Sequence, residues 1–159
     1  KDLMTIDGVG EVKAIQIACV VELSKRLAMS KRRQNISFRC PKDIADYFME
    51  EMRSLEVEQV MLLMLDGKAS LIQSKVITSG TVNASIASPR EIFKCALRYD
   101  AVNIVLLHNH PSGDPQPSNE DIMVTKRVYE TSQLVGIPLV DHLIIGDGQY
   151  ISMKERGYI

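Results

Sequence analysis

Residues 102–121 read Val-Asn-Ile-Val-Leu-Leu-His-Asn-His-Pro-Ser-Gly-Asp-Pro-Gln-Pro-Ser-Asn-Glu-Asp. The first six residues are mostly aliphatic and predict a short buried strand. This strand leads directly into His108 and His110, which are followed by a loop rich in proline. Ser118 then has the residue type that caps the beginning of a helix. We therefore expect a strand, a stiff loop and a helix start in immediate succession.

Two imidazoles and a carboxylate in this stretch form a candidate metal-binding set. Residues two apart on a strand point to the same face, so His108 and His110 can face one ion. Asp121 falls one turn into the expected helix and can reach the same point. Two histidines and one aspartate suit a catalytic zinc site with a fourth position open to water. The chain has only three histidines, so placing two of them here favours an enzyme.

A structural interpretation of the same residues is also open. Ser118 is a good N-cap, and Asp121 at the third helical position favours the helix dipole. Histidines near the end of a strand can be ordinary surface residues. Spacing alone favours the metal site, although short motifs produce false matches. The two interpretations are compatible, because Ser118 can begin the helix while Asp121 binds a metal.

The chain from residue 36 onward predicts one domain in which helices and strands are mixed. Asp66-Gly67 is a strong signal for a hairpin turn, and a β-α-β-α-β order follows the hairpin. We expect an α/β (α+β) fold with a mixed sheet flanked by helices. The expected helices cover residues 41–52, 88–99 and 118–134, and the expected strands cover residues 58–66, 69–77, 80–86, 102–107, 139–145 and 149–152.

The first 35 residues predict a separate appendage. Residues 1–30 are expected to be mainly helical after a glycine turn at residues 6–10, and residues 31–35 are expected to be a basic linker. The turn and Ala14 resemble half of a helix-hairpin-helix motif, whose backbone N–H groups contact a DNA phosphate. Residues 1–39 contain eight Lys/Arg and four Asp/Glu, and this +4 suits phosphate contact. Such helices also serve as packing or protein-interaction modules.

Composition excludes several classes of protein. The chain of 159 residues is 45% hydrophobic and 25% charged, with a net charge of −1, which is ordinary for a soluble globular protein. No run approaches the roughly 20 apolar residues of a membrane span, and no signal peptide is recognised. Cys19, Cys40 and Cys95 are widely spaced, which is typical of reduced cysteines in a cytoplasmic protein. The chain begins without an initiator methionine, so we expect a piece of a longer protein.

The spacing His-x-His, seven residues, Ser, two residues, Asp resembles the JAMM (MPN-plus) signature of zinc metalloproteases. The surrounding sequence resembles the bacterial RadC family over residues 36–159. The motifs are His-Asn-His-Pro-Ser-Gly at 108–113, Asp-His-Leu-Ile-Ile-Gly at 141–146 and Glu-Arg-Gly at 155–157. The resemblance implies a JAMM/cytidine-deaminase-like fold with a zinc ion held by His108, His110 and Asp121.

The JAMM pattern also places a glutamate upstream, at the start of a strand. Glu58 precedes the apolar run at residues 60–65 and matches that position; Glu56 is the nearest alternative and Glu91 a remote one. By the resemblance, Glu58 takes a proton from the attacking water and passes it to the leaving amine. Ser118, in the same pattern, donates a hydrogen bond to the oxyanion of the tetrahedral intermediate.

Two further residues near the motif have open roles. His142 either orients a ligand or touches substrate, or it is an ordinary hydrogen-bonded histidine of a strand. Asp114 lies in the loop, and its neighbours indicate a turn residue.

The leading hypothesis is a zinc hydrolase that cleaves a peptide or isopeptide bond in a protein substrate, with water as nucleophile. The alternative is a DNA-associated module, as the name of the RadC family suggests, with a secondary or vestigial metal site. The identity of the substrate and the oligomeric state are left open.

Overall fold

The computed structural model describes residues 3–33, 36–80 and 87–159. The chain divides into two compact units, Lys1–Ile36 and Ser37–Ile159. Each unit is described by itself below.

The first unit contains a short 3-10 helix, η1 (Leu3–Thr5), and one long helix, α1 (Glu11–Arg33). Between them, Gly8 has a φ of +78°, a conformation that only glycine adopts without strain. Lys13 Nζ donates to the Gly8 carbonyl at 2.9 Å, which ties the turn to the first turn of α1. The predicted DNA contact of this segment stays a prediction.

The prediction of a basic linker at residues 31–35 is wrong for the first three of these residues. Residues 31–33 form the last turn of α1. Lysine and arginine are good helix formers, and α1 contains neither glycine nor proline, so the loss of apolar residues does not end the helix. Residues 34–35 lie outside the described residues.

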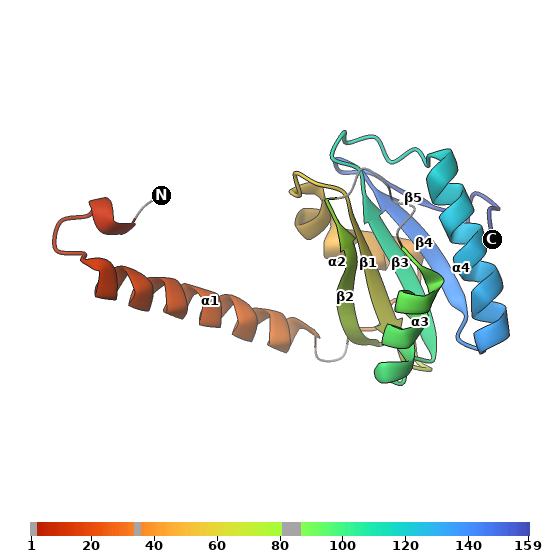
Figure 1. Cartoon of the computed structure of the whole chain (residues 1–159), viewed down its shortest axis with the longest axis horizontal. Coiled ribbons are helices and arrows are strands. Elements are labelled where there is room, and N and C mark those ends of the chain that lie inside the picture. Colours follow the sequence, from red (N-terminus) through yellow and green to blue (C-terminus); the bar gives the residue numbers. More distant parts are fainter. Residues whose placement is uncertain (1–2, 34–35, 81–86) are drawn as a thin grey trace. The chain divides into compact units, whose positions relative to one another are not determined.

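The second unit is a mixed five-stranded sheet with helices on both faces, which confirms the predicted fold class. The strand order is β2-β1-β3-β4-β5; β3 and β4 pair in parallel, and the other neighbours are antiparallel. Helix α2 lies on one face, and α3 and α4 lie on the other (Figure 1). The elements are α2 (Pro41–Arg53), β1 (Gln59–Leu65), β2 (Leu71–Ser79), α3 (Pro89–Arg98), β3 (Asn103–Asn109), α4 (Asn119–Val135), β4 (Leu139–Ile145) and β5 (Tyr150–Ser152).

The predicted hairpin is formed by β1 and β2. Asp66 Oδ1 accepts hydrogen bonds from the backbone N–H groups of Lys68 and Ser70, both at 2.8 Å, as expected of an aspartate that begins a turn. Gln59 pairs with Ser79 at the open end of the hairpin. The strand predicted at residues 80–86 lies outside the described residues, except for Gly80.

The two middle strands, β1 and β3, are buried on both faces. Six of the seven residues in each are buried, as expected of strands covered by helices on both sides. Leu62 and Leu106 join α3 and α4 in one core cluster. Strand β3 continues two residues beyond the predicted end at Leu107, so His108 and Asn109 belong to the sheet.

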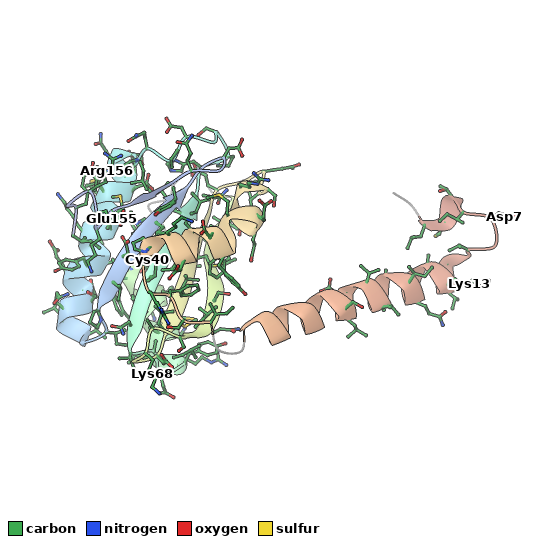
Figure 2. The ribbon with its side chains drawn as sticks, turned by 180° about the vertical axis from the view of Figure 1, so that it is seen from behind. Asp7, Lys13, Cys40, Lys68, Glu155 and Arg156 are labelled. Carbon is green, nitrogen blue, oxygen red and sulfur yellow. The ribbon has the colours of Figure 1, made fainter. Side chains whose placement is uncertain are left out.

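Helix α2 covers the opposite face of the sheet. Its buried residues are Ile44, Ala45, Phe48 and Met52, which recur at helical spacing. Figure 2, which views the molecule from the side opposite to Figure 1, shows this face, with Cys40 at the beginning of the helix.

The three cysteines are free, and Cys95 alone among them is buried. Among the described residues, no helix has the length and apolar character needed to cross a membrane.

Asp141 on β4 ties the end of the edge strand β5 and the residues after it to the sheet. Its side chain is almost fully buried, and burial raises its pKa although hydrogen bonds from Ser152 and Lys154 act in the opposite direction. Asp141 accepts from Ser152 Oγ at 2.5 Å, from the His142 N–H at 2.7 Å and from the Lys154 N–H at 3.1 Å. This carboxylate therefore satisfies three donors, two of them in buried hydrogen bonds.

We predict that Asp141→Ala lowers the free energy of unfolding by about 1–3 kcal/mol, because buried donors lose their acceptor. Urea unfolding followed by circular dichroism measures the change. Asp46→Ala is the matched control, since Asp46 forms only an exposed i,i+4 pair with Lys42, and its unfolding midpoint should not move. Equal midpoints for the two variants would contradict this role of Asp141.

Candidate metal centre

The candidate site lies where β3 ends, beside the residue that precedes β1. Val60 of β1 pairs with His108 of β3 in an antiparallel ladder. Glu58 is two residues before Val60, and His110 is two residues after His108. Because the strands are antiparallel, Glu58 therefore lies across from His110. Ligand atoms of Glu58, His108 and His110 all lie within 4.8 Å of one another. Two segments fifty residues apart in the chain thus contribute to one group.

Asp121 contacts both histidines of this group. Its Oδ1 lies 3.2 Å from His108 Nδ1, and its Oδ2 lies 3.4 Å from His110 Nε2. The carboxylate is 1% exposed, so water does not compete for it. The structure thus brings together the three residues predicted as metal ligands. Glu58 belongs to the metal-compatible group, and neither Glu56 nor Glu91 does.

The helix start holds Asp121 in place, and the predicted N-cap at Ser118 is confirmed. Ser118 Oγ accepts from the Asp121 N–H at 3.1 Å, and Asp121 Oδ2 accepts from the Ser118 N–H at 2.8 Å. These two bonds form a capping box. Ser118 Oγ also donates to Asp121 Oδ2 at 2.6 Å. The serine is thus both helix cap and partner of the carboxylate, while its predicted contact with an oxyanion stays a prediction.

The backbone of the proline-rich loop orients His110. His110 Nδ1 lies 2.8 Å from the carbonyl oxygen of Asp114. A carbonyl can only accept, so Nδ1 carries a proton, and Nε2 is the ring nitrogen that faces Asp121. The Asp114 side chain accepts from the Gln116 N–H at 3.0 Å, as in a turn. Sequence reasoning missed the carbonyl, because every residue has one and its direction depends on the turn.

His142 is a buried neighbour of the ligand group and is linked to Asp121 through Thr125. Thr125 Oγ1 donates to the Asp121 carbonyl at 2.6 Å and lies 2.7 Å from His142 Nδ1. The hydroxyl has one proton, so Nδ1 of His142 is the donor in the second bond. Burial lowers the pKa of His142 to about 3, which keeps the imidazole neutral. Sequence reasoning missed Thr125, whose only signal is its position one turn after Asp121.

The protonation states of His108 and Asp121 suit metal binding. Burial lowers the pKa of His108, although the charge of Asp121 acts in the opposite direction. The hydrogen bond with Asp121 raises the pKa of His110. Burial opposes ionisation of Asp121, but hydrogen bonds from His110 and Ser118 outweigh it and hold its pKa well below the usual range. A neutral His108 and an ionised Asp121 are the forms that a cation binds.

One buried nitrogen atom in this group lacks a hydrogen-bond partner among the described residues. His108 Nε2 is buried and has no hydrogen-bond partner in the described part of the chain. A buried polar atom without a partner carries a cost in free energy, and a bound cation would remove it. Imidazole nitrogens together with carboxylate oxygens suit divalent transition metals. Glu58, His108 and His110 could therefore hold a metal ion, with Asp121 against both histidines.

A polar cavity of about 400 Å³ opens beside His110. It lies between the end of α2, the loop after His110 and the turn between β4 and β5. Arg53 and Asp147 both line the cavity and form an ion pair at 3.6 Å. His110 is the residue of the ligand group that lines this cavity.

Gly146 is required where the loop passes close to the β4–β5 turn. A Cβ at residue 146 would lie 2.2 Å from the Gly113 carbonyl oxygen and 2.8 Å from Pro115 Cδ. Both atoms belong to the loop that orients His110. We predict that Gly146→Ala displaces this loop and weakens the affinity for a divalent metal ion about 10–100-fold, the usual effect of losing a group that orients a metal ligand.

Competition with a chelator measures the affinity. Gly67→Ala is the matched control, because a Cβ at that position meets no atom within 4 Å and its φ is not in the left-handed range. Equal metal affinities for the two variants would show that the loop does not orient His110.

Comparison with known proteins agrees with this geometry. A family model described as a RadC-like JAB domain matches residues 38–158. A UPF0758 protein of Desulforamulus reducens is 43% identical over the whole chain, which covers 70% of that relative. One of Geobacillus thermodenitrificans is 46% identical with the same coverage. One of Caldanaerobacter subterraneus is 47% identical over 98% of the chain and 67% of its own length. With the JAB domain matched over nearly the whole second unit, the chain belongs to the RadC family.

Proposed function

We propose that this protein is a zinc-dependent hydrolase that cleaves a peptide or isopeptide bond with water as nucleophile. One observation carries the proposal: the carboxylate of Glu58 meets the two histidines of β3 within 4.8 Å. A purely structural histidine pair does not need an exposed glutamate from the segment before β1. The membership of a JAB-domain family is consistent with hydrolytic chemistry.

In this proposal His108, His110 and Asp121 hold the metal. Two nitrogens and one carboxylate leave a fourth position open, which is the arrangement of catalytic zinc sites. When bound, zinc supplies Lewis acidity, which lowers the pKa of water toward about 7 and polarises a carbonyl. The remaining tasks belong to side chains of the protein.

Glu58 is proposed to move the proton. Its side chain is exposed, whereas His108 is buried and His110 is partly buried. An exposed carboxylate can take a proton from water and release it again, because it stays in contact with solvent. General acid–base catalysis by a positioned side chain contributes typically 10²–10⁴-fold to rate. Neither histidine can serve as the base while its nitrogen binds a metal.

Ser118 is proposed to steady the oxyanion. Its hydroxyl lies 2.6 Å from the carboxylate of Asp121, at the N-terminus of α4, where backbone N–H groups and the helix dipole favour negative charge. A hydroxyl proton can turn from one acceptor to another without moving the backbone. A donor of this kind lowers a barrier by about 2.7–4 kcal/mol.

A polypeptide is the proposed substrate. The cavity beside His110 is lined by charged and polar side chains from three segments, including Glu50, Arg53 and Asp147. Pockets for small apolar ligands are lined mainly by hydrophobic side chains, and this cavity is not. Its size suits the residues that flank a scissile bond.

We predict that the purified protein contains about one zinc per chain and that His108→Ala loses it. His142→Gln is the matched control, because His142 is buried nearby but is not one of the metal-compatible ligands. Metal analysis by mass spectrometry gives the stoichiometry. Equal zinc content in wild type and His108→Ala would overturn the ligand assignment.

We predict that Glu58→Gln keeps its zinc and loses peptide hydrolysis by about 10²–10⁴-fold, because the amide cannot accept a proton. Glu56→Gln, two residues away, should retain activity. Digestion of a peptide library with wild type and both variants, read by mass spectrometry, gives the cleavage rates. Undiminished cleavage by Glu58→Gln would remove Glu58 from the mechanism.

A further inference from the structure

Asn109 lies between the two histidines and faces away from them. It is the last residue of β3 and is 1% exposed. Side chains alternate along a strand, so Asn109 points to the face opposite His108 and His110. Its amide makes two hydrogen bonds, and both go to the backbone of the segment that carries Glu58.

The two bonds lie on either side of Glu58. Asn109 Oδ1 accepts from the Gln59 N–H at 2.7 Å. Asn109 Nδ2 donates to the Val57 carbonyl at 3.1 Å. A primary amide is the only side chain of this size with an adjacent donor and acceptor. Asn109 thus clamps the backbone immediately before and after the glutamate.

The clamp acts where the regular ladder between β1 and β3 has ended. The last pair of that ladder is Val60 with His108. On the other side of β1, the Glu58 carbonyl accepts from the Gly80 N–H at 3.0 Å. On the β3 side, the amide of Asn109 takes the place of the missing ladder bonds. Residues 57–59 are therefore held from both sides.

We propose that Asn109 is a positioning residue, which fixes the backbone of residues 57–59 so that the carboxylate of Glu58 faces His108 and His110. The catalytic consequence rests on the proposed function, whereas the clamp itself does not. Loss of the amide frees Glu58 from the metal-compatible group without removing a metal ligand. Metal affinity and the proton-transferring step should therefore respond differently to the same substitution.

A merely structural role predicts a different result. Any substitution of a buried residue on β3 lowers stability, so a matched control is needed. Leu107 is on the same strand, points to the same face and is fully buried, and it pairs with Met61 in the regular part of the ladder. Leu107→Val, or Leu107→Ala where a larger loss is required, can be matched to Asn109→Ala in Tm.

The first experiment needs no substrate. Amide hydrogen exchange at Gln59 should become at least about tenfold faster in Asn109→Ala and should not change in the matched Leu107 variant. Cobalt(II) is then bound as a spectroscopic probe. Asn109→Ala should bind cobalt with the affinity of wild type, because no metal ligand is removed, and should change the visible spectrum as Glu58→Gln does. Asn109→Leu, close in volume to asparagine, provides a second variant.

A double variant separates the two roles. In Glu58→Gln, adding Asn109→Ala should cause no further spectral change, because the group that Asn109 positions is already altered. Equal changes in both backgrounds, or an equal increase in Gln59 exchange for the Leu107 control, would overturn the proposal. These outcomes are independent of whether any peptide is cleaved, so they remain decisive if the proposed hydrolysis fails.

Kinetics test the catalytic consequence. Asn109→Ala should lower kcat about 10–100-fold with KM unchanged. In the Glu58→Gln background it should cause no further loss, since residues that act as a unit are not additive. A loss of the same size in both backgrounds, or in the matched Leu107 variant, would show that Asn109 does not act through Glu58.

Discussion

The antiparallel pairing of β1 with β3 is the constraint on which the site depends. Val60 opposite His108 places Glu58 across from His110, and a slip of one residue would move the histidines to the other face of the sheet. Six of the seven residues in each strand are buried, and most of the buried ones are apolar. Helices cover both faces, so the register cannot slip without exposing a core side chain. The packing of the buried side chains of β1 and β3 thus fixes the positions of the titratable residues at the end of the ladder.

The helix start on α4 supplies the second constraint. Asp121 Oδ2 accepts from Ser118 while Oδ1 faces His108, so one carboxylate both caps a helix and holds an imidazole. The carboxylate is kept ionised because its hydrogen bonds outweigh the effect of burial. Stability and ligand geometry are therefore linked at this residue. A substitution of Asp121 removes a cap and a ligand together, and unfolding data are needed to interpret its effect on metal binding.

Much of this arrangement could be predicted from local pattern, and the failures have physical causes. Asp66-Gly67 predicts the hairpin between β1 and β2, and Ser118 predicts the start of α4. Both predictions succeed because a turn and a helix cap depend only on neighbouring residues. The end of β3 was misplaced because His108 and Asn109 are polar, although both are buried in the sheet. The linker was misplaced because polarity does not end a helix. The carbonyl of Asp114 and the link from Thr125 to His142 depend on tertiary geometry that residue type does not encode.

Each functional group lies where regular structure ends: at the last residues of β3, at the start of α4 and just before β1. Such ends leave backbone groups without partners, and side chains must satisfy them. Here those side chains are Ser118, Asp121 and Asn109, and their partners belong to the residues that form the site. The hydrogen bonds that complete the fold are thus the ones that orient the candidate ligands and the candidate base. Such a site needs no further residues to orient its side chains. Its geometry, however, can be no more rigid than the ends of the helices and strands that carry these side chains.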